Sequence, residues 1–123
     1  MTVANRTSGK SVLLVDDDDS ARESIKLLLS IDRHLVAEAR NGQEAIELFT
    51  KLSFDLVILD FAMPGMQGAE LAQRLRTLGP KVPILMVTAY LEKLTEADKP
   101  VDAVLAKPFG VDELRQTIAK LIG

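Results

Sequence analysis

Polar side chains that could take part in phosphoryl or metal chemistry directly follow short apolar stretches at four places in this sequence. They are Asp16 and Asp17 after 12–15, Asp60 after 56–59, Thr88 after 84–87 and Lys107 after 101–105. If these stretches are parallel strands, their carboxyl ends lie at one edge of the sheet. The polar groups would then meet at that edge.

The aspartates suggest a cation site. Carboxylates from neighbouring strand ends repel one another, which raises a pKa unless a cation lies between them. Oxygen ligands with open positions suit Mg²⁺, or Mn²⁺ in its place. The alternative for the run 16–19 is a solvated turn and helix N-terminus, which the helix dipole favours. We predict that alternative for Asp18 and Asp19, and ligation for Asp16 and Asp17.

Asp60 is charged but follows a wholly apolar stretch, so it either begins a loop or has a functional role. The presence of Asp16 and Asp17 favours a metal-assisted role. A carboxylate can act as a nucleophile toward phosphorus, and phosphoryl transfer needs mainly positioning and charge stabilisation. The Thr88 hydroxyl could donate to a phosphoryl oxygen, and the Lys107 ammonium could pair with one.

The rest of the sequence alternates strand and helix patterns, as a scaffold for such a site requires. Apolar, β-branched stretches predict strands at 12–15, 35–37, 56–59, 84–87 and 101–105. Amphipathic segments predict helices from Ser20, with Glu23 completing a capping box, and at 42–51, capped by Asn41, 69–78 and 112–122. In the first helix Arg22, Glu23 and Lys26 are predicted to face outward. Residues 90–100 have room for at most about two helical turns.

This alternation predicts a doubly wound α/β fold with a parallel sheet covered on both faces. Right-handed crossovers leave few topologies, the flavodoxin-like order 2-1-3-4-5 among them. With 123 residues the chain is expected to form one domain, 11–123, after a flexible N-terminal tail, 1–10.

Composition narrows the range of functions. The absence of cysteine excludes disulfides and thiolate metal sites. The net charge is −3, whereas proteins that bind nucleic acids typically carry a basic patch, so no nucleic-acid partner is expected. No apolar run is long enough to span a membrane, and a cytoplasmic location is expected. His34 is predicted to be a surface or edge residue without a chemical role.

Four motifs together resemble the CheY-like receiver domains of two-component response regulators. They are Asp16-Asp17, Asp60 with Met63-Pro64-Gly65, Thr88-Ala89, and Lys107-Pro108-Phe109. The resemblance extends from about Ser11 to Ile122. It implies a flavodoxin-like (βα)5 fold with strand order 2-1-3-4-5. It also implies a signalling domain rather than an enzyme acting on other molecules, either a stand-alone regulator or the receiver of a hybrid histidine kinase.

The resemblance implies a role for each residue. Asp60 would be phosphorylated by a histidine kinase or a histidine phosphotransfer protein. Asp17 and Asp60 would ligate Mg²⁺ directly, Asp16 through water, and Ala62 through its backbone carbonyl. Lys107 would pair with the phosphoryl group, Thr88 would move toward it to signal to a downstream protein, and the Lys107-Pro108 bond would be cis.

Two positions depart from the pattern. Many receivers carry Tyr or Phe three residues before the lysine, where this chain has Val104, so the usual aromatic readout is not expected. Ala62 has no side chain to orient an attacking water, which predicts a phosphoryl group that is not unusually short-lived. Tyr90, on the loop after the fourth strand, would either shield that group or lie on the surface.

Three alternatives remain at this point. An aspartate-nucleophile phosphatase would need a DxD-type motif after the first strand and usually a cap domain. A nucleotide- or flavin-binding module would need a glycine-rich phosphate loop where this chain has four aspartates. A degenerate receiver used only as an interaction platform would have lost site residues, whereas Asp16, Asp17, Asp60, Thr88 and Lys107 are all present.

Overall fold

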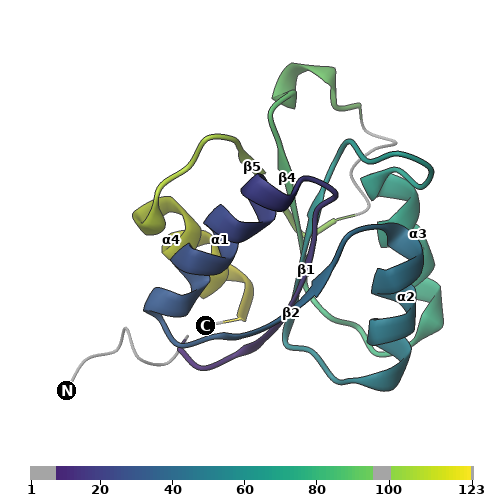
Figure 1. The fold of residues 1–123 in the computed structure, drawn as a ribbon, viewed down its shortest axis with the longest axis horizontal. Helices are drawn as coiled ribbons and strands as arrows, with labels where there is room; N and C mark the ends of the chain where they lie inside the picture. Colours follow the sequence, from purple (N-terminus) through teal and green to yellow (C-terminus); the bar gives the residue numbers. More distant parts are fainter. Residues whose placement is uncertain (1–7, 96–100, 123) are drawn as a thin grey trace.

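The computed structural model describes residues 8–95 and 101–122, which form a parallel sheet flanked by helices (Figure 1). The elements are β1 Ser11–Val15, α1 Asp19–Ile31, β2 Leu35–Ala39, α2 Gly42–Lys51, β3 Leu56–Asp60, α3 Gly68–Leu78, β4 Ile84–Thr88, the 3-10 turn η2 Leu91–Lys93, β5 Ala103–Ala106 and α4 Val111–Ile122. The strand order is β2-β1-β3-β4-β5, and every pair is parallel. The expected flavodoxin-like fold and strand order are confirmed.

The two faces of the sheet carry separate cores. One lies beneath α2 and α3 and takes Leu13 and Val15 from β1. The other lies beneath α1 and α4 and takes Val12 and Leu14 from the same strand (Figure 1). Because alternate side chains of a strand point to opposite faces, a strand covered on both faces must be apolar at successive positions. This is why the central strands appear as nearly uninterrupted apolar runs in the sequence.

The helix starts are determined by side-chain caps. The Asp18 carboxylate accepts hydrogen bonds from the backbone N–H groups of Ser20 and Ala21, so Asp18 is the N-cap of α1. The predicted capping box at Ser20 is therefore wrong, because the helix already begins at Asp19 and Ser20 lies inside its first turn. The predicted helix-terminal role of Asp18 and the Asn41 cap of α2 are confirmed.

The segment between β4 and β5 contains a single 3-10 turn, Leu91–Lys93, among its described residues. Residues 96–100 lie outside the described part, so the short helix predicted within 90–100 is only partly tested. β5 begins at Ala103 rather than at 101. None of the helices in residues 8–95 and 101–122 is both long and apolar enough to cross a membrane.

The predicted N-terminal tail lies outside the described residues up to position 7. Beyond it, the Gly9 N–H donates to the Asp32 carbonyl, and the Lys10 N–H donates to Nδ1 of His34 at 3.0 Å. His34 directly precedes the edge strand β2, as one alternative of the prediction has it, but it is buried rather than on the surface, because it accepts a hydrogen bond from this N-terminal segment. Burial lowers the pKa of His34, so the imidazole is neutral at physiological pH and serves as a hydrogen-bond acceptor.

Candidate functional site

The carboxyl edge of the sheet collects the polar residues that the sequence singled out. Asp16 follows β1, Asp60 ends β3, Thr88 ends β4 and Lys107 follows β5. These four strands are consecutive neighbours in the sheet. Parallel pairing therefore brings the residues together, although up to 91 positions separate them along the chain.

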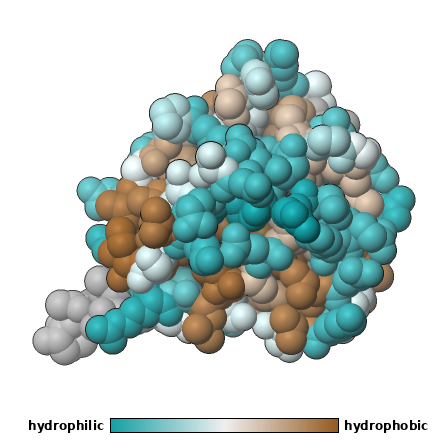
Figure 2. Space-filling model, in the orientation of Figure 1, coloured by the Kyte–Doolittle hydropathy of each residue, from teal (hydrophilic) through white to brown (hydrophobic). Residues whose placement is uncertain are grey.

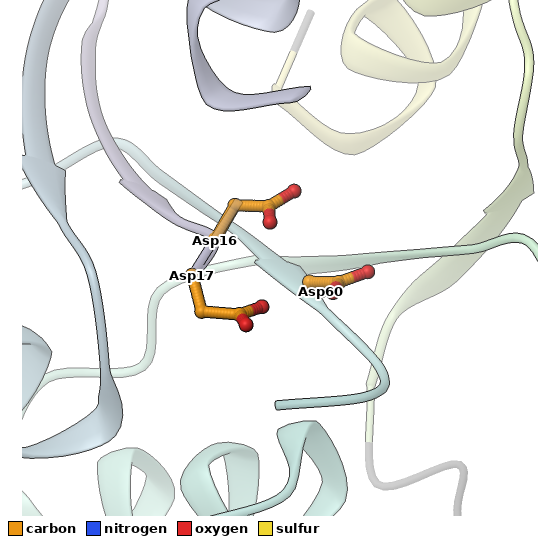
Figure 3. Close-up of side chains that lie close together, drawn as sticks. All are labelled: Asp16, Asp17 and Asp60. Atoms are coloured by element: carbon orange, nitrogen blue, oxygen red, sulfur yellow. The ribbon is translucent and has the colours of Figure 1, made fainter. Parts of the chain in front are cut away.

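Three carboxylates form an acidic cluster at this edge. Asp16 and Asp17 extend from the end of β1 beside Asp60 of β3 (Figure 3). One oxygen of each lies within 4.8 Å of the others. Asp16 and Asp60 are only 1% and 8% exposed, whereas Asp17 is exposed. Carboxylate oxygens with one accessible side are the donors that Mg²⁺ prefers, so this set fits a divalent cation.

Lys107 supplies the positive charge of the cluster. Its Nζ lies 3.1 Å from Oδ2 of Asp16 and 3.1 Å from Oδ1 of Asp60. Burial raises the pKa of Asp60, an effect that Lys107 opposes and that the charges of Asp16 and Asp17 reinforce. Burial alone would lower the pKa of Lys107, but its attraction to Asp60 and Asp16 outweighs this and raises the pKa. Lys107 is therefore protonated at physiological pH.

Thr88 is nearly inaccessible, at 1% exposure. Its Oγ1 accepts a hydrogen bond from the Tyr90 N–H at 2.8 Å, and its carbonyl accepts one from the Lys107 N–H at 2.7 Å. Thr88 thus connects the loop after β4 to the lysine after β5. Tyr90 is 46% exposed and extends from this loop.

Residues 12–119 match the family described as the response regulator receiver domain. The chain belongs to this family. A receiver in this family is a signalling domain of two-component response regulators.

Individual relatives agree with the family match. The response regulator MprA of Mycolicibacterium vanbaalenii is 37% identical over 114 residues, covering 90% of this chain and 49% of MprA. The response regulator TrrA of Thermotoga maritima, in complex with Mg²⁺-BeF, has a TM-score of 0.82 and 36% identity, covering 91% of this chain and 98% of TrrA. TrrA in complex with the histidine kinase ThkA has a TM-score of 0.83 and 35% identity, covering 93% and 99%. The receiver spans about half the length of the curated relatives it matches.

The loop after β3 is held by hydrogen bonds to β4 and to the start of α3. The Phe61 N–H donates to the Val87 carbonyl, and the Gly68 N–H donates to the Phe61 carbonyl at 2.9 Å. Met63 is buried in the core beside α3, which anchors the loop. Ala62 is exposed on the loop, and metal ligation by its carbonyl stays a prediction.

The turn after β5 aims Lys107 into the cluster. The Lys107-Pro108 peptide bond is cis, as the resemblance implies. Phe109 then packs against the core beneath α1 and α4. The apolar contact of Phe109 holds one side of the turn, and the Lys107–Thr88 backbone hydrogen bond holds the other.

One residue of this receiver's site was not predicted from the sequence. Arg22, predicted to face outward, has a side chain only 11% exposed, and it donates to the Asp16 carbonyl at 2.8 Å. The prediction is wrong because Arg22 lies over the end of β1 rather than toward solvent. The position of Arg22 near the start of a predicted helix could have indicated this inward contact. The helix dipole disfavours a cation there, so its side chain needs a negatively charged or carbonyl partner.

Proposed function

We propose that Asp60 accepts a phosphoryl group from the phosphohistidine of a histidine kinase or a histidine phosphotransfer protein, in a cytoplasmic phosphorelay. The observation that carries this proposal is the buried Asp60 carboxylate, which lies beside Asp16 and 3.1 Å from the Lys107 ammonium. A carboxylate oxygen forms the new P–O bond as the P–N bond to the donor imidazole breaks. The imidazole nitrogen keeps that electron pair, and the product is an acyl phosphate.

Lys107 and Thr88 respond to the added charge. A phosphoryl group carries about −1.5 to −2 charge, so Lys107 gains a stronger partner than the carboxylate alone. The Thr88 hydroxyl can donate to a phosphoryl oxygen. Turning toward it would weaken the hydrogen bond that Thr88 accepts from Tyr90, at 2.8 Å. With Val104 in place of an aromatic residue, we assign the readout to this loop, whose displacement a downstream protein would recognise.

Mg²⁺, or Mn²⁺, would be held by Asp17, Asp60, the Ala62 carbonyl and, through water, Asp16. When bound, the cation would neutralise charge on the transferring group. Support comes from the carboxylate oxygens, which approach within 4.8 Å of one another. Further support comes from TrrA, which was crystallised with Mg²⁺-BeF.

The phosphodonor would dock beside Lys107. A hollow of about 190 Å³ there is lined mostly by apolar side chains, namely Ala21, Ser24, Ile25, Leu28, Lys107, Pro108 and Phe109. Hydrophobic surface gathers on this side of the molecule, over α1 and the start of α4 (Figure 2). We propose that a helix of the donor protein covers it, which brings a phosphohistidine next to Asp60. TrrA, in its complex with ThkA, supports a kinase as that partner.

Incubation with Mg²⁺ and acetyl phosphate, followed by intact mass measurement, tests the proposal. The wild type should gain one phosphoryl group, and Asp60→Asn should gain none. Asp112→Asn, which changes an aspartate that is 86% exposed on α4, is the matched control and should behave like the wild type. Phosphorylation of the D60N variant would refute the assignment. Failure of the wild type to react would favour a degenerate receiver, and sustained hydrolysis of a phosphomonoester would favour a phosphatase.

A further inference from the structure

Arg22 uses every nitrogen of its guanidinium group as a donor. Nη1 donates to the Asp16 carbonyl at 2.8 Å, Nε to Oε1 of Glu38 at 3.0 Å, and Nη2 to Oδ1 of Asp19 at 2.6 Å. These acceptors belong to the end of β1, to the edge strand β2 and to the first residue of α1. A single side chain therefore joins three segments at the acidic cluster.

Helix stability does not account for this placement. Arg22 lies in the first turn of α1, where the helix dipole disfavours a cation. Its partner Asp19 is 81% exposed, and such exposed ion pairs contribute little stability. The less exposed partner is Glu38, at 31%, which also pairs with Lys26 at 3.0 Å. Hydrophilic surface gathers over this part of α1 and β2 (Figure 2).

The carbonyl that Arg22 holds belongs to the peptide between Asp16 and Asp17. The N–H on the other side of Asp16 donates to the Ala39 carbonyl of β2 at 3.1 Å. The Asp16 carboxylate is bound to the Asp18 N–H and to Lys107. Asp17 is exposed, so the direction of its carboxylate depends on how that peptide is fixed.

We propose that Arg22 is a positioning residue of the acidic site. Braced by Glu38, it fixes the Asp16-Asp17 peptide so that the Asp17 carboxylate faces that of Asp60 and the two can ligate one divalent cation. The inference rests on the proposed function, because it assigns a purpose to the geometry of the same cation site. Arg22 acts through the backbone carbonyl of Asp16 and not through contact with the cation.

The Arg22→Lys variant tests the inference, because it keeps the charge but a single ammonium group cannot reach all three acceptors. We expect R22K to bind Mg²⁺ about tenfold more weakly by isothermal titration calorimetry, the loss typical when support for metal ligands is removed. The Mg²⁺ concentration for half-maximal phosphorylation by acetyl phosphate should rise equally. The maximal rate at saturating Mg²⁺ should stay close to that of the wild type.

Two controls separate positioning from charge and from stability. Lys26→Gln removes a cation that shares Glu38 but does not contact Asp16, so its Mg²⁺ affinity should stay unchanged. Arg115→Gln removes a two-bond pair with Asp32 far from the site, and it should lower the melting temperature without changing Mg²⁺ affinity. Glu38→Ala, which loosens Arg22 indirectly, should give an affinity between those of the wild type and R22K.

Wild-type Mg²⁺ affinity in R22K would overturn the inference, as would an equal loss in K26Q. If R22K does not fold, an unchanged affinity in E38A would overturn it instead. If the wild type itself binds no Mg²⁺, the proposed cation site fails and the inference fails with it. Wild-type affinity in R22K, or an equal loss in K26Q, would leave Mg²⁺ binding and phosphorylation of Asp60 intact. Failure of the inference about Arg22 can therefore be told apart from failure of the proposed cation site.

Discussion

Asp60 occupies a position where an ionised carboxylate is costly for the folded receiver. It is 8% exposed and has Asp16 and Asp17 as neighbours, with Lys107 as its cationic partner. The net result is a raised pKa, for which burial is the largest cause. A group whose pKa is raised on folding stabilises the protein below its unfolded pKa and loses that contribution as the pH rises through its folded pKa.

We therefore expect Asp60→Asn to stabilise the metal-free protein at pH 7. The amide keeps the shape of the carboxylate without its charge. In EDTA the melting temperature should rise by about 3–5 °C, the change that roughly 1 kcal/mol produces in a domain of this size. The gain should disappear as the pH falls below the ordinary aspartate value of 3.8. A D60N variant that melts below the wild type at pH 7 would contradict the claim that the ionised Asp60 carboxylate destabilises the folded protein.

The start of α3 packs against the backbone that carries Asp60. A Cβ atom at Gly68 would overlap the Asp60 carbonyl oxygen and would lie 3.0 Å from Cα of Phe61. Both are backbone atoms, which cannot turn aside as a side chain does. The missing side chain at Gly68 thus allows α3 and β3 to approach each other.

The Gly68→Ala variant should be destabilised by about 2 kcal/mol or more, because the loop after β3 must shift to admit the methyl group. Phosphorylation by acetyl phosphate should slow at the same time, since the shift displaces Asp60. Gly110→Ala is the matched control, because a Cβ atom there meets nothing within 4 Å. Urea denaturation of both variants checks the difference. Equal stability of G68A and G110A would mean that the contact relaxes at no cost.

Asp102 joins three elements just before β5. Its Oδ2 accepts hydrogen bonds from Arg76 of α3 and from the Ile84 N–H of β4, each at 2.7 Å. Burial acts to raise the pKa of Asp102, but these hydrogen bonds outweigh it and hold the pKa below 3.8. The carboxylate therefore stabilises the fold above its unfolded pKa, and this contribution is lost as the pH falls through the folded pKa.

The Asp102→Asn variant should lose about 1 kcal/mol at pH 7, a modest loss because the side chain is 34% exposed. The difference from the wild type should narrow as the pH falls below about 4. Urea midpoints measured from pH 7 down to about pH 3 test this, with the exposed Asp112→Asn variant as control. A difference that widens toward low pH would exclude the ion pair as its source.

For the molecule as a whole, cation binding at the acidic cluster would be linked to folding. The residues of the acidic cluster follow β1 or end β3, and these two strands pair only in the folded sheet. A cation that binds this cluster binds the native state and not the unfolded chain, and so it stabilises the whole domain. Relief of the charge repulsion between the carboxylates contributes to the free energy of cation binding.

Mg²⁺ at about ten times its dissociation constant should therefore stabilise the wild type by about 1.4 kcal/mol. EDTA should reverse the rise in melting temperature. In EDTA Asp17→Asn should melt at or slightly above the wild-type temperature, because it removes a charge that repels Asp60, but it should respond little to Mg²⁺. An equal Mg²⁺ response in D17N would place the cation elsewhere.

The amino-acid sequence predicted the α/β architecture and the polar residues that gather at the carboxyl edge of the sheet. Hydrophobic periodicity separated strands from helices, because strands covered on both faces must be apolar at successive positions. Parallel strands end at a common edge, so Asp16, Asp60, Thr88 and Lys107 could be placed together without a structure. The strand order remained one of several until the family motifs were considered.

How these residues are held in place could be seen only in the folded structure. Arg22 turned inward to the Asp16 carbonyl, His34 was buried, and Asp18 rather than Ser20 capped α1. Periodicity describes which face of an element is apolar, but it contains no information about a single hydrogen bond between distant segments. The bond from Arg22 to Glu38 exists because the sheet places β2 beside β1. Such contacts depend on packing in three dimensions, which is why the support of the acidic site appears only in the folded molecule.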